Sequence, residues 1–319
     1  MTRFINRRYS VTMSVDVLRK LDLNLLLTLD ALLRERNVTR AAARLGVTQP
    51  AVSAALGRLR RHFADELLRR SGNKYELTPL AEQLATTTGT ALLGVRRVFE
   101  ATPIFDPVTA DREFTIIMSD YAAIVLGDHL ATAMEREAPG VRLRLQEQGA
   151  HAVNHPLEAL RSVDGMILPH GFLSDIPVLD LFEDSWVCVV ATENDQVGDT
   201  LTLKELSQLP WVVTYNAPTA FTPAVRQLQM LGIEPRVQVV VENFSALPFL
   251  VAGTNRVALM QAMLAERVAR SAGVRILPCP WDVVPLAEGF WWHPMQTADP
   301  AHLWLRTMLR RAGGDLSSQ

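Results

Sequence analysis

Polar and basic side chains gather in the first quarter of the sequence at spacings that suit contact with a polyanion. Gln49 and Ser53 lie four residues apart, and so on one face of any helix that spans them. Their side chains are of the type that hydrogen-bonds base edges in the major groove of DNA, while basic groups nearby would hold phosphates. The surrounding candidate contacts are Thr39, Arg40, Thr48, Pro50, Arg58, Arg69 and Lys74.

The distribution of charge supports the same interpretation. Residues 1–77 hold 15 Lys and Arg against 7 Asp and Glu, a net charge of +8, whereas the remainder carries −10 and the whole chain −2. A basic block joined to an acidic body suggests that only the first part meets a polyanion. The alternative for each single arginine is an ordinary solvated charge.

Other chemistry has little support in the residue types. No nucleophile motif, phosphate-binding loop or metal-ligand cluster is present, so we expect no enzyme, no cofactor and no metal site. Only two cysteines occur, which excludes a disulfide scaffold. Cys188 lies in an apolar run and Cys279 lies between two prolines, whereas a redox-sensing thiol is exposed and activated by positive charge.

The elements that must position Gln49 and Ser53 are short helices. Helical patterns over residues 21–34, 40–45 and 48–63 are separated by breaks, with Thr39 and Thr48 as expected N-caps and Gly46 as a C-cap. Pro50 is tolerated in a first turn. Helix, tight turn and polar second helix form a helix-turn-helix, and residues 67–78 follow as a hairpin, or wing, with Lys74 at its tip.

A long helix over residues 80–101 carries an apolar stripe, and a lone helix of this length needs a partner, most simply a second copy of the chain. The predicted organisation is therefore as follows: a flexible basic arm at 1–17, or a true start at Met13; a winged helix-turn-helix domain at 18–79; a dimerisation helix at 80–102; a hinge linker at 103–112; and an α/β domain at 113–311.

Residues 113–311 alternate between strand and helix patterns, which is typical of parallel α/β sheets in one large domain or two lobes. Hydrophobic residues make up 48% of the chain, enough for ordinary cores. No run approaches the roughly 18 apolar residues needed to span a membrane. A cytoplasmic location is the resulting expectation.

The run Val38-Thr-Arg-Ala-Ala-Ala-Arg-Leu-Gly-Val-Thr-Gln-Pro-Ala-Val-Ser53 resembles the signature of LysR-type transcriptional regulators, as do Leu67-Leu68-x-Arg70 and Leu77-Thr78-Pro79. Segments 117–121 and 247–257 resemble the branch that contains nodulation and aromatic-catabolism regulators. Arg60 and Leu80-Ala81 depart from the family pattern, where an acidic residue and Ala-Gly are common.

This resemblance implies a winged helix-turn-helix, a linker helix and a two-lobed effector domain like the periplasmic binding proteins. The chain is expected to cross between lobes near 169–175 and again near 274–280. The implied partners are a dyad-symmetric DNA operator, a small-molecule effector such as an aromatic or other organic acid, and a second copy through residues 80–101, with tetramers and RNA polymerase as further candidates. A redox-responsive or ligand-independent DNA-binding regulator is the alternative.

Candidate effector contacts lie where strands end, because α/β folds bind ligands there. For Ser119 the alternative to ligand binding is a structural role as a helix cap, and Asp120 beside it could cap the helix itself and compete. For His170 the alternative is a buried histidine whose hydrogen bonds are satisfied within the protein. Aromatic residues near 290 have the alternative of a core role. The candidates are Ser119, Tyr121, His170, Tyr215, Asn216, Phe221, Asn243, Phe244 and Phe290.

Overall fold

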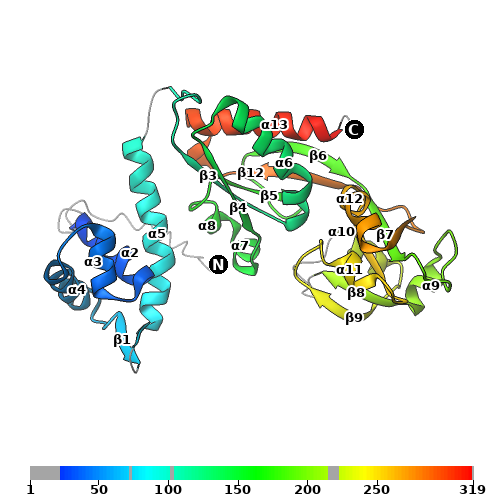
Figure 1. The fold of residues 1–319 in the computed structure, drawn as a ribbon, viewed down its shortest axis with the longest axis horizontal. Coiled ribbons are helices and arrows are strands. Elements are labelled where there is room, and N and C mark those ends of the chain that lie inside the picture. Colours follow the sequence, from blue (N-terminus) through cyan, green and yellow to red (C-terminus); the bar gives the residue numbers. More distant parts are fainter. Residues whose placement is uncertain (1–21, 72–73, 101–103, 215–222, 318–319) are drawn as a thin grey trace, which may run out of the picture. The chain divides into compact units, whose positions relative to one another are not determined.

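The computed structural model describes residues 22–71, 74–100, 104–214 and 223–317. The chain divides into two compact units, an N-terminal unit to residue 101 and a C-terminal unit from residue 102, and each is described by itself (Figure 1). Within the described residues, no helix is both long and apolar enough to cross a membrane.

The N-terminal unit packs three helices against the start of a long fourth one, with a two-stranded hairpin between them. Leu29, Leu32, Val52, Leu56 and Leu59 form its small core, together with neighbouring apolar side chains. The elements are α2 (Leu23–Glu35), α3 (Val38–Leu45), α4 (Gln49–Phe63), β1 (Leu68–Ser71), β2 (Lys74–Leu77) and α5 (Pro79–Glu100).

Local capping explains where these helices begin and end. The Asn37 side chain, not Thr39, caps α3 by accepting a hydrogen bond from the Arg40 N–H at 2.9 Å, so the predicted N-cap at Thr39 was wrong. Because Asn37 is the N-cap residue, α3 begins at Val38, two residues earlier than expected. Gly46 ends α3 with φ at +67°, a conformation that suits glycine. Thr48 is the N-cap residue of α4.

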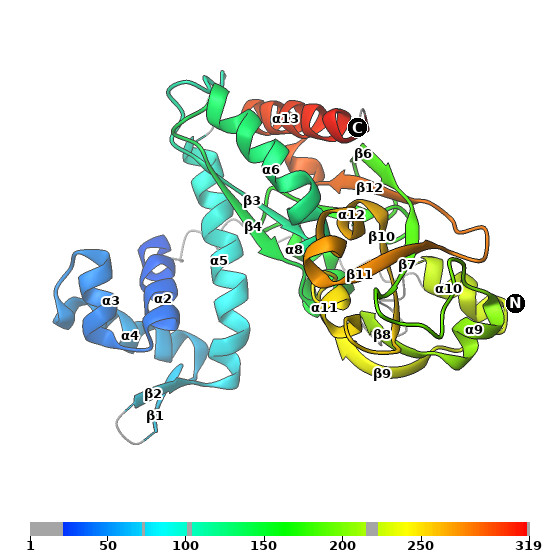
Figure 2. The ribbon, with the colours of Figure 1, turned by 45° about the vertical axis from the view of Figure 1, so that its right-hand side comes forward.

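Two five-stranded sheets form the C-terminal unit, and we call the regions around them lobe I and lobe II (Figures 1 and 2). In spatial order, lobe I contains β4 (Arg142–Glu147), β3 (Glu113–Met118), β5 (Gly165–Pro169), β12 (Leu286–Trp291) and β6 (Val178–Asp184). Lobe II contains β11 (Val274–Pro278), β7 (Trp186–Ala191), β10 (Val257–Gln261), β8 (Pro210–Thr214) and β9 (Arg236–Val241).

Helices cover both sheets. Alternate residues of β3 point to opposite faces, so Ile116 joins the core beneath α6 while Ile117 packs toward α7 and α8. In lobe I the helices are α6 (Asp120–Glu137), α7 (Ala150–Asn154), α8 (Pro156–Ala159), η1 (Pro294–Gln296) and α13 (Pro300–Ser317). In lobe II they are α9 (Leu203–Gln208), α10 (Pro223–Met230), α11 (Leu247–Val251) and α12 (Ala262–Ala272).

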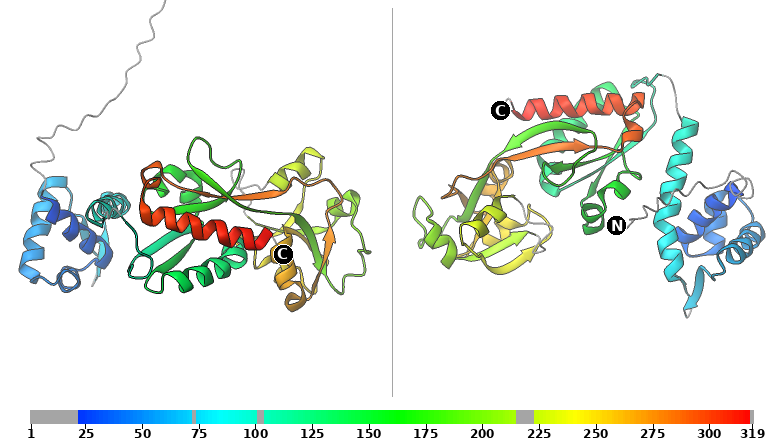
Figure 3. Two further views of the ribbon diagram at one scale, coloured as in Figure 1. Left: turned by 90° about the horizontal axis from the view of Figure 1, so that it is seen from above. Right: turned by 180° about the vertical axis from the view of Figure 1, so that it is seen from behind.

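The chain passes between the lobes twice, through two connections that lie side by side (Figure 3). The first runs from β6 to β7 at residues 184–186, so the expected crossover at 169–175 was wrong: β6 still belongs to lobe I. The return occupies 279–285, between β11 and β12. Both sheets are mixed rather than parallel, because β7 and β12 run antiparallel to their neighbours.

Candidate nucleic-acid interface and effector site

The recognition face, which we define as Gln49 and Ser53 of α4, is exposed to solvent. Val52, Leu56 and Leu59 on the opposite side of the helix are buried in the unit's core. A helix of this kind presents its polar groups outward while its apolar face fixes its orientation. The two side chains that the sequence assigned to base contacts are therefore brought together, near the N-terminus of one helix.

The first turn of α4 is itself suited to an anion. It contains no acidic residue, and Thr48 makes no hydrogen bond from its side chain to cap the helix. Pro50 occupies this turn and removes one N–H donor, which leaves the other N–H groups as a ready site for a phosphate. Thr39, Thr48, Arg69 and Lys74 are all exposed, which is compatible with the backbone contacts expected of them.

Two of the predicted phosphate-binding arginines are already paired within the protein. Arg58 forms an ion pair with Asp22, with 2.9 Å between Nη2 and Oδ2. Arg40 lies 3.4 Å from the Glu35 carboxylate and also donates to the Glu35 carbonyl oxygen. Any contact of these arginines with DNA must therefore compete with the existing partner, although exposed pairs of this type are weak.

The C-terminal end of α5 exposes apolar side chains. Val95 is 36% exposed, Val98 72% and Phe99 86%. Large apolar groups that lie this close together on one helix end favour burial against a partner surface.

In the C-terminal unit, α6 begins at the junction of the lobes. Ser119 is its N-cap and accepts a hydrogen bond from the Ala122 N–H at 3.2 Å, so its hydroxyl has the structural role that the sequence left as an alternative. Asn243 likewise accepts from the Ala246 N–H at 3.1 Å, just before α11. Both side chains stabilise turns at the edges where a ligand was expected.

Asp120 joins the two lobes directly. Its Oδ1 accepts from the Phe244 N–H at 3.0 Å and its Oδ2 from the Ser245 N–H at 2.7 Å. We call this contact, made by Asp120, Phe244 and Ser245, the interlobe clasp. From the sequence, Asp120 complicated the interpretation of Ser119 beside it; the structure directs the Asp120 carboxylate to lobe II. Charge-assisted hydrogen bonds of this kind are among the stronger polar contacts.

Tyr121 and Asp184 form a second polar contact near the lobe junction, between α6 and the end of β6. Tyr121 is 0% exposed and donates its hydroxyl proton to Asp184 Oδ2 at 2.7 Å, so it is not an accessible ligand contact and that prediction was wrong. Asp184 also accepts from the N–H groups of Ser185 and Met263, and thereby connects the end of β6 to lobe II.

Asp184 and Glu288, which we call the acidic pair, lie on paired strands of lobe I: Asp184 ends β6, just before the first interlobe connection, and Glu288 lies in β12, which follows the return connection. Burial, followed by the charge of Asp184, raises the pKa of Glu288 to about 8. Burial also raises the pKa of Asp184, against the lowering effect of its hydrogen bonds. Glu288 Oε2 has no hydrogen-bond partner within the described structure. The acidic pair therefore favours holding a proton at neutral pH.

The remaining predicted effector residues are scattered. His170 is exposed rather than buried, and its Nε2 lies 2.8 Å from Asp180 Oδ1. Phe290 is 0% exposed and packs against Trp292 and His302 in the core of lobe I, so its assignment to a ligand wall was wrong. Tyr215, Asn216 and Phe221 lie outside the described residues.

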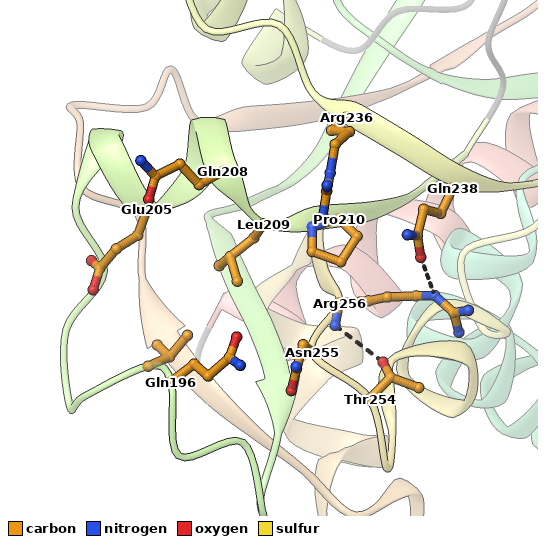
Figure 4. Close-up of a pocket in the computed structure, with 11 residues that line it drawn as sticks. Gln196, Glu205, Gln208, Leu209, Pro210, Arg236, Gln238, Thr254, Asn255 and Arg256 are labelled. Atoms are coloured by element: carbon orange, nitrogen blue, oxygen red, sulfur yellow. Dashed lines mark hydrogen bonds between the residues drawn. The ribbon is translucent and has the colours of Figure 1, made fainter.

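Lobe II contains a cavity that the sequence did not signal, with a volume of about 560 Å³ (Figure 4). It lies between the C-terminal end of α9 and the starts of β8, β9 and β10. The interlobe clasp follows the opposite, C-terminal end of β9. Polar residues far apart in the sequence meet here, and no local pattern could have grouped them. We call it the lobe II pocket.

The two cysteines, 91 residues apart, also meet. Their Sγ atoms lie 3.9 Å apart, with Cys188 buried and Cys279 half-buried. The hydrogen bond with Cys279, reinforced by burial, raises the pKa of the Cys188 thiol. A raised pKa disfavours the reactive thiolate, so proximity alone does not make this pair a redox sensor.

Comparisons with known proteins agree with these features. Residues 23–82 match the family model "Bacterial regulatory helix-turn-helix protein, lysR family", and residues 109–314 match the LysR substrate binding domain. Nodulation protein D 2 of Rhizobium tropici is 35% identical over 294 residues, covering 91% of this chain and 92% of that protein. Nodulation protein D 3 of Mesorhizobium japonicum is 37% identical, with coverage of 91% and 96%.

Solved structures show the same fold. A "probable transcriptional regulator" from Pseudomonas aeruginosa superposes with a TM-score of 0.69 at 30% identity, over 92% of this chain and 98% of that one. Full-length CbnR in complex with its target DNA superposes with a TM-score of 0.66 at 17% identity, over 92% and 100%. With a matched helix-turn-helix, a matched substrate-binding domain and relatives along nearly its whole length, this chain belongs to the LysR family: it is a DNA-binding transcriptional regulator, not an enzyme.

Proposed function

We propose that this regulator binds a dyad-symmetric operator as a homodimer and responds to an organic acid that binds between the lobes of its C-terminal unit. The observation that carries the DNA-binding part is the recognition face: Gln49 and Ser53 are exposed on α4 above a buried apolar side. In this proposal they contact base edges, and Thr39, Thr48, Arg69 and Lys74 hold the phosphates.

Dimerisation through α5 is supported by the exposed side chains at its end, Val95, Val98 and Phe99. A second copy related by a twofold axis would cover the same side chains on both helices and would place two recognition faces on two half-sites. Tetramers and contacts with RNA polymerase are further steps that we propose on family grounds. Since it binds DNA, we expect the protein to act in the cytoplasm.

The effector proposal is supported by the interlobe clasp. Two successive N–H groups, those of Phe244 and Ser245, hold a carboxylate there, and it comes from the protein's own Asp120. Phe249, on the helix that follows the clasp, is 57% exposed and offers an aromatic surface. An aromatic acid that competes with Asp120 for these amides would replace one carboxylate with another. The two amides would therefore keep a charged acceptor when Asp120 releases them.

Such exchange acts as a switch only if the effector has different affinities for the two lobe arrangements. Tight binding to both arrangements would change nothing. In this proposal the difference comes from the clasp, which is closed in one arrangement and released in the other.

Fluorescence anisotropy on the duplex upstream of the protein's own gene, against a scrambled duplex at several salt concentrations, tests the DNA-binding proposal. We expect much tighter binding to the upstream duplex. Footprinting on the same duplex should show a protected region that changes when benzoate is added. Equal binding to both duplexes would contradict operator recognition at this locus. An unchanged footprint with benzoate and with related aromatic acids would contradict the effector class.

A further inference from the structure

The lobe II pocket lies at the end of the sheet that faces away from the interlobe clasp. Pro210 begins β8 and Arg236 begins β9, and both line the pocket, whereas the clasp follows the end of β9. A strand of five or six residues spans about 15–20 Å. A ligand in this pocket would therefore not overlap with one held at the clasp.

Two guanidinium groups line the pocket, those of Arg236 and Arg256. Among the described residues, no aspartate or glutamate forms an ion pair with Arg236 or Arg256. Arg236 extends from β9 toward Pro210 (Figure 4). Two uncompensated positive charges at a concave surface attract an anion.

Arg256 is held in place by neutral groups. Its Nε donates to Gln238 Oε1 at 3.2 Å and its Nη1 to the Leu250 carbonyl oxygen at 3.1 Å. The Arg256 N–H donates to Thr254 Oγ1 at 3.1 Å, which fixes the turn before β10. These contacts position the guanidinium without neutralising it, so less entropy is lost when a ligand binds.

The rest of the lining supplies neutral hydrogen-bonding groups. The side chains of Gln196, Gln208 and Asn255 line the cavity from three different segments (Figure 4). Among the residues that the structure describes, Glu205 is the one acidic residue of the lining. Its Oε2 already accepts from the N–H and the hydroxyl of Thr202, both at 2.7 Å, and its carboxylate points away from the two arginines.

We propose that the lobe II pocket is a second ligand site, which binds a small organic anion with two or more carboxylate or phosphate groups. Arginine suits both groups because its planar donors match paired oxygens, and the surrounding amides would bind the remaining oxygens. A volume of about 560 Å³ has room for such a metabolite and lies within the usual range of ligand sites.

Binding here has a direct route to the interlobe region. The Leu250 carbonyl, which accepts from Arg256, belongs to the five-residue helix α11, and α11 follows immediately after the clasp amides of Phe244 and Ser245. An anion bound to the Arg256 guanidinium would therefore act on α11 through this hydrogen bond. The proposal of a second site stands on the pocket alone and does not depend on the effector proposed for the clasp.

Isothermal titration calorimetry on the full-length protein tests this site, with citrate and inorganic phosphate as separate probes at constant ionic strength. The informative variant is Arg236→Gln, because Arg236 is exposed and forms no ion pair within the described structure, so its loss should leave the fold intact. Arg226→Gln is the matched control: Arg226 is an exposed arginine of α10 outside the pocket. Equal urea midpoints for the three proteins would verify folding.

We expect at least one probe to bind the wild type and the Arg226→Gln variant equally, and the Arg236→Gln variant roughly tenfold more weakly. Binding of citrate alone would identify carboxylates as the ligand groups, and binding of phosphate alone would identify phosphates. The proposal is overturned if neither probe binds the wild type with a Kd below about 1 mM. Equal affinity in the Arg236→Gln variant would overturn it as well.

Discussion

The recognition face and the interlobe clasp present polar groups in opposite states. Gln49 and Ser53 on α4 are exposed, and the first turn of that helix has no side-chain cap. At the clasp, Asp120 already binds the amides of Phe244 and Ser245. Under the proposed function, the recognition face is therefore ready for DNA, whereas an effector at the lobe junction must first displace a hydrogen-bonded carboxylate of the protein itself. If the proposal is right, this difference allows regulation, because an effector can compete with a contact that the protein makes with itself.

The sharpest test of the recognition face is Gln49→Ala. Loss of a paired base contact costs about 1–3 kcal/mol, so operator affinity should fall about 5- to 150-fold, while affinity for a scrambled duplex stays the same. Fluorescence anisotropy at fixed salt measures both. Gln83→Ala on α5, also an exposed glutamine, is the control and should change neither value. Equal losses on the two duplexes would show that Gln49 has no role in sequence recognition.

The substitution Asp120→Ala tests the interlobe clasp. Two N–H groups lose their charged acceptor, so the free energy of unfolding should fall by about 1–3 kcal/mol. The amides of Phe244 and Ser245 should also exchange hydrogen faster, as measured by mass spectrometry on the peptide that contains them. Asp128→Ala, an exposed position on the same helix, is the matched control. Unchanged exchange at both amides would show that the clasp does not hold the lobes together in solution.

The acidic pair predicts a pH dependence that the recognition face does not share. The pKa of Glu288 is raised to about 8 from an ordinary value near 4.5, so the folded state binds a proton that the unfolded state releases. Stability should therefore decrease as pH rises between these values and level off above pH 8. His302, whose pKa burial lowers to about 4, acts in the opposite direction below pH 6.5. The clear window is thus pH 6.5–8.

Urea unfolding of the wild type and of the Glu288→Gln variant across that window separates the pH dependence due to Glu288 from that of other groups. We expect the wild type to lose about 1–2 kcal/mol from pH 6.5 to pH 8, since one pH unit corresponds to about 1.4 kcal/mol for a single proton. The variant should lose far less. Parallel slopes for the two proteins would mean that Glu288 is not the group that holds the proton.

The smallest effect is expected at the cysteines. Because the pKa of Cys188 is raised, we expect millimolar peroxide to leave operator affinity within about twofold of its starting value and to produce no Cys188–Cys279 disulfide. Intact-mass analysis and anisotropy before and after treatment check both points. A disulfide accompanied by a change in operator affinity would instead support the redox-responsive alternative.

The N-terminal unit followed closely from its sequence because its elements are local. Caps, the Gly46 turn and apolar spacing act over a few residues, and the one wrong cap, at Thr39, reflects a competing asparagine two positions earlier. The C-terminal unit was harder for a physical reason. Strands β6 and β12 were not singled out, and their pairing depends on a chain that leaves lobe I and returns about a hundred residues later. Periodicity contains no information about such partners.

By itself, the sequence determined the family, the helix-turn-helix and the basic charge of the DNA-binding block, because motif order, helix period and charge are properties of neighbouring residues. Only the tertiary structure decided that Phe290 belongs to the core, that Asp120 binds the opposite lobe, and that Arg236 and Arg256 line one pocket. These outcomes depend on contacts between residues far apart in the chain, and such contacts are settled by which surfaces pack together.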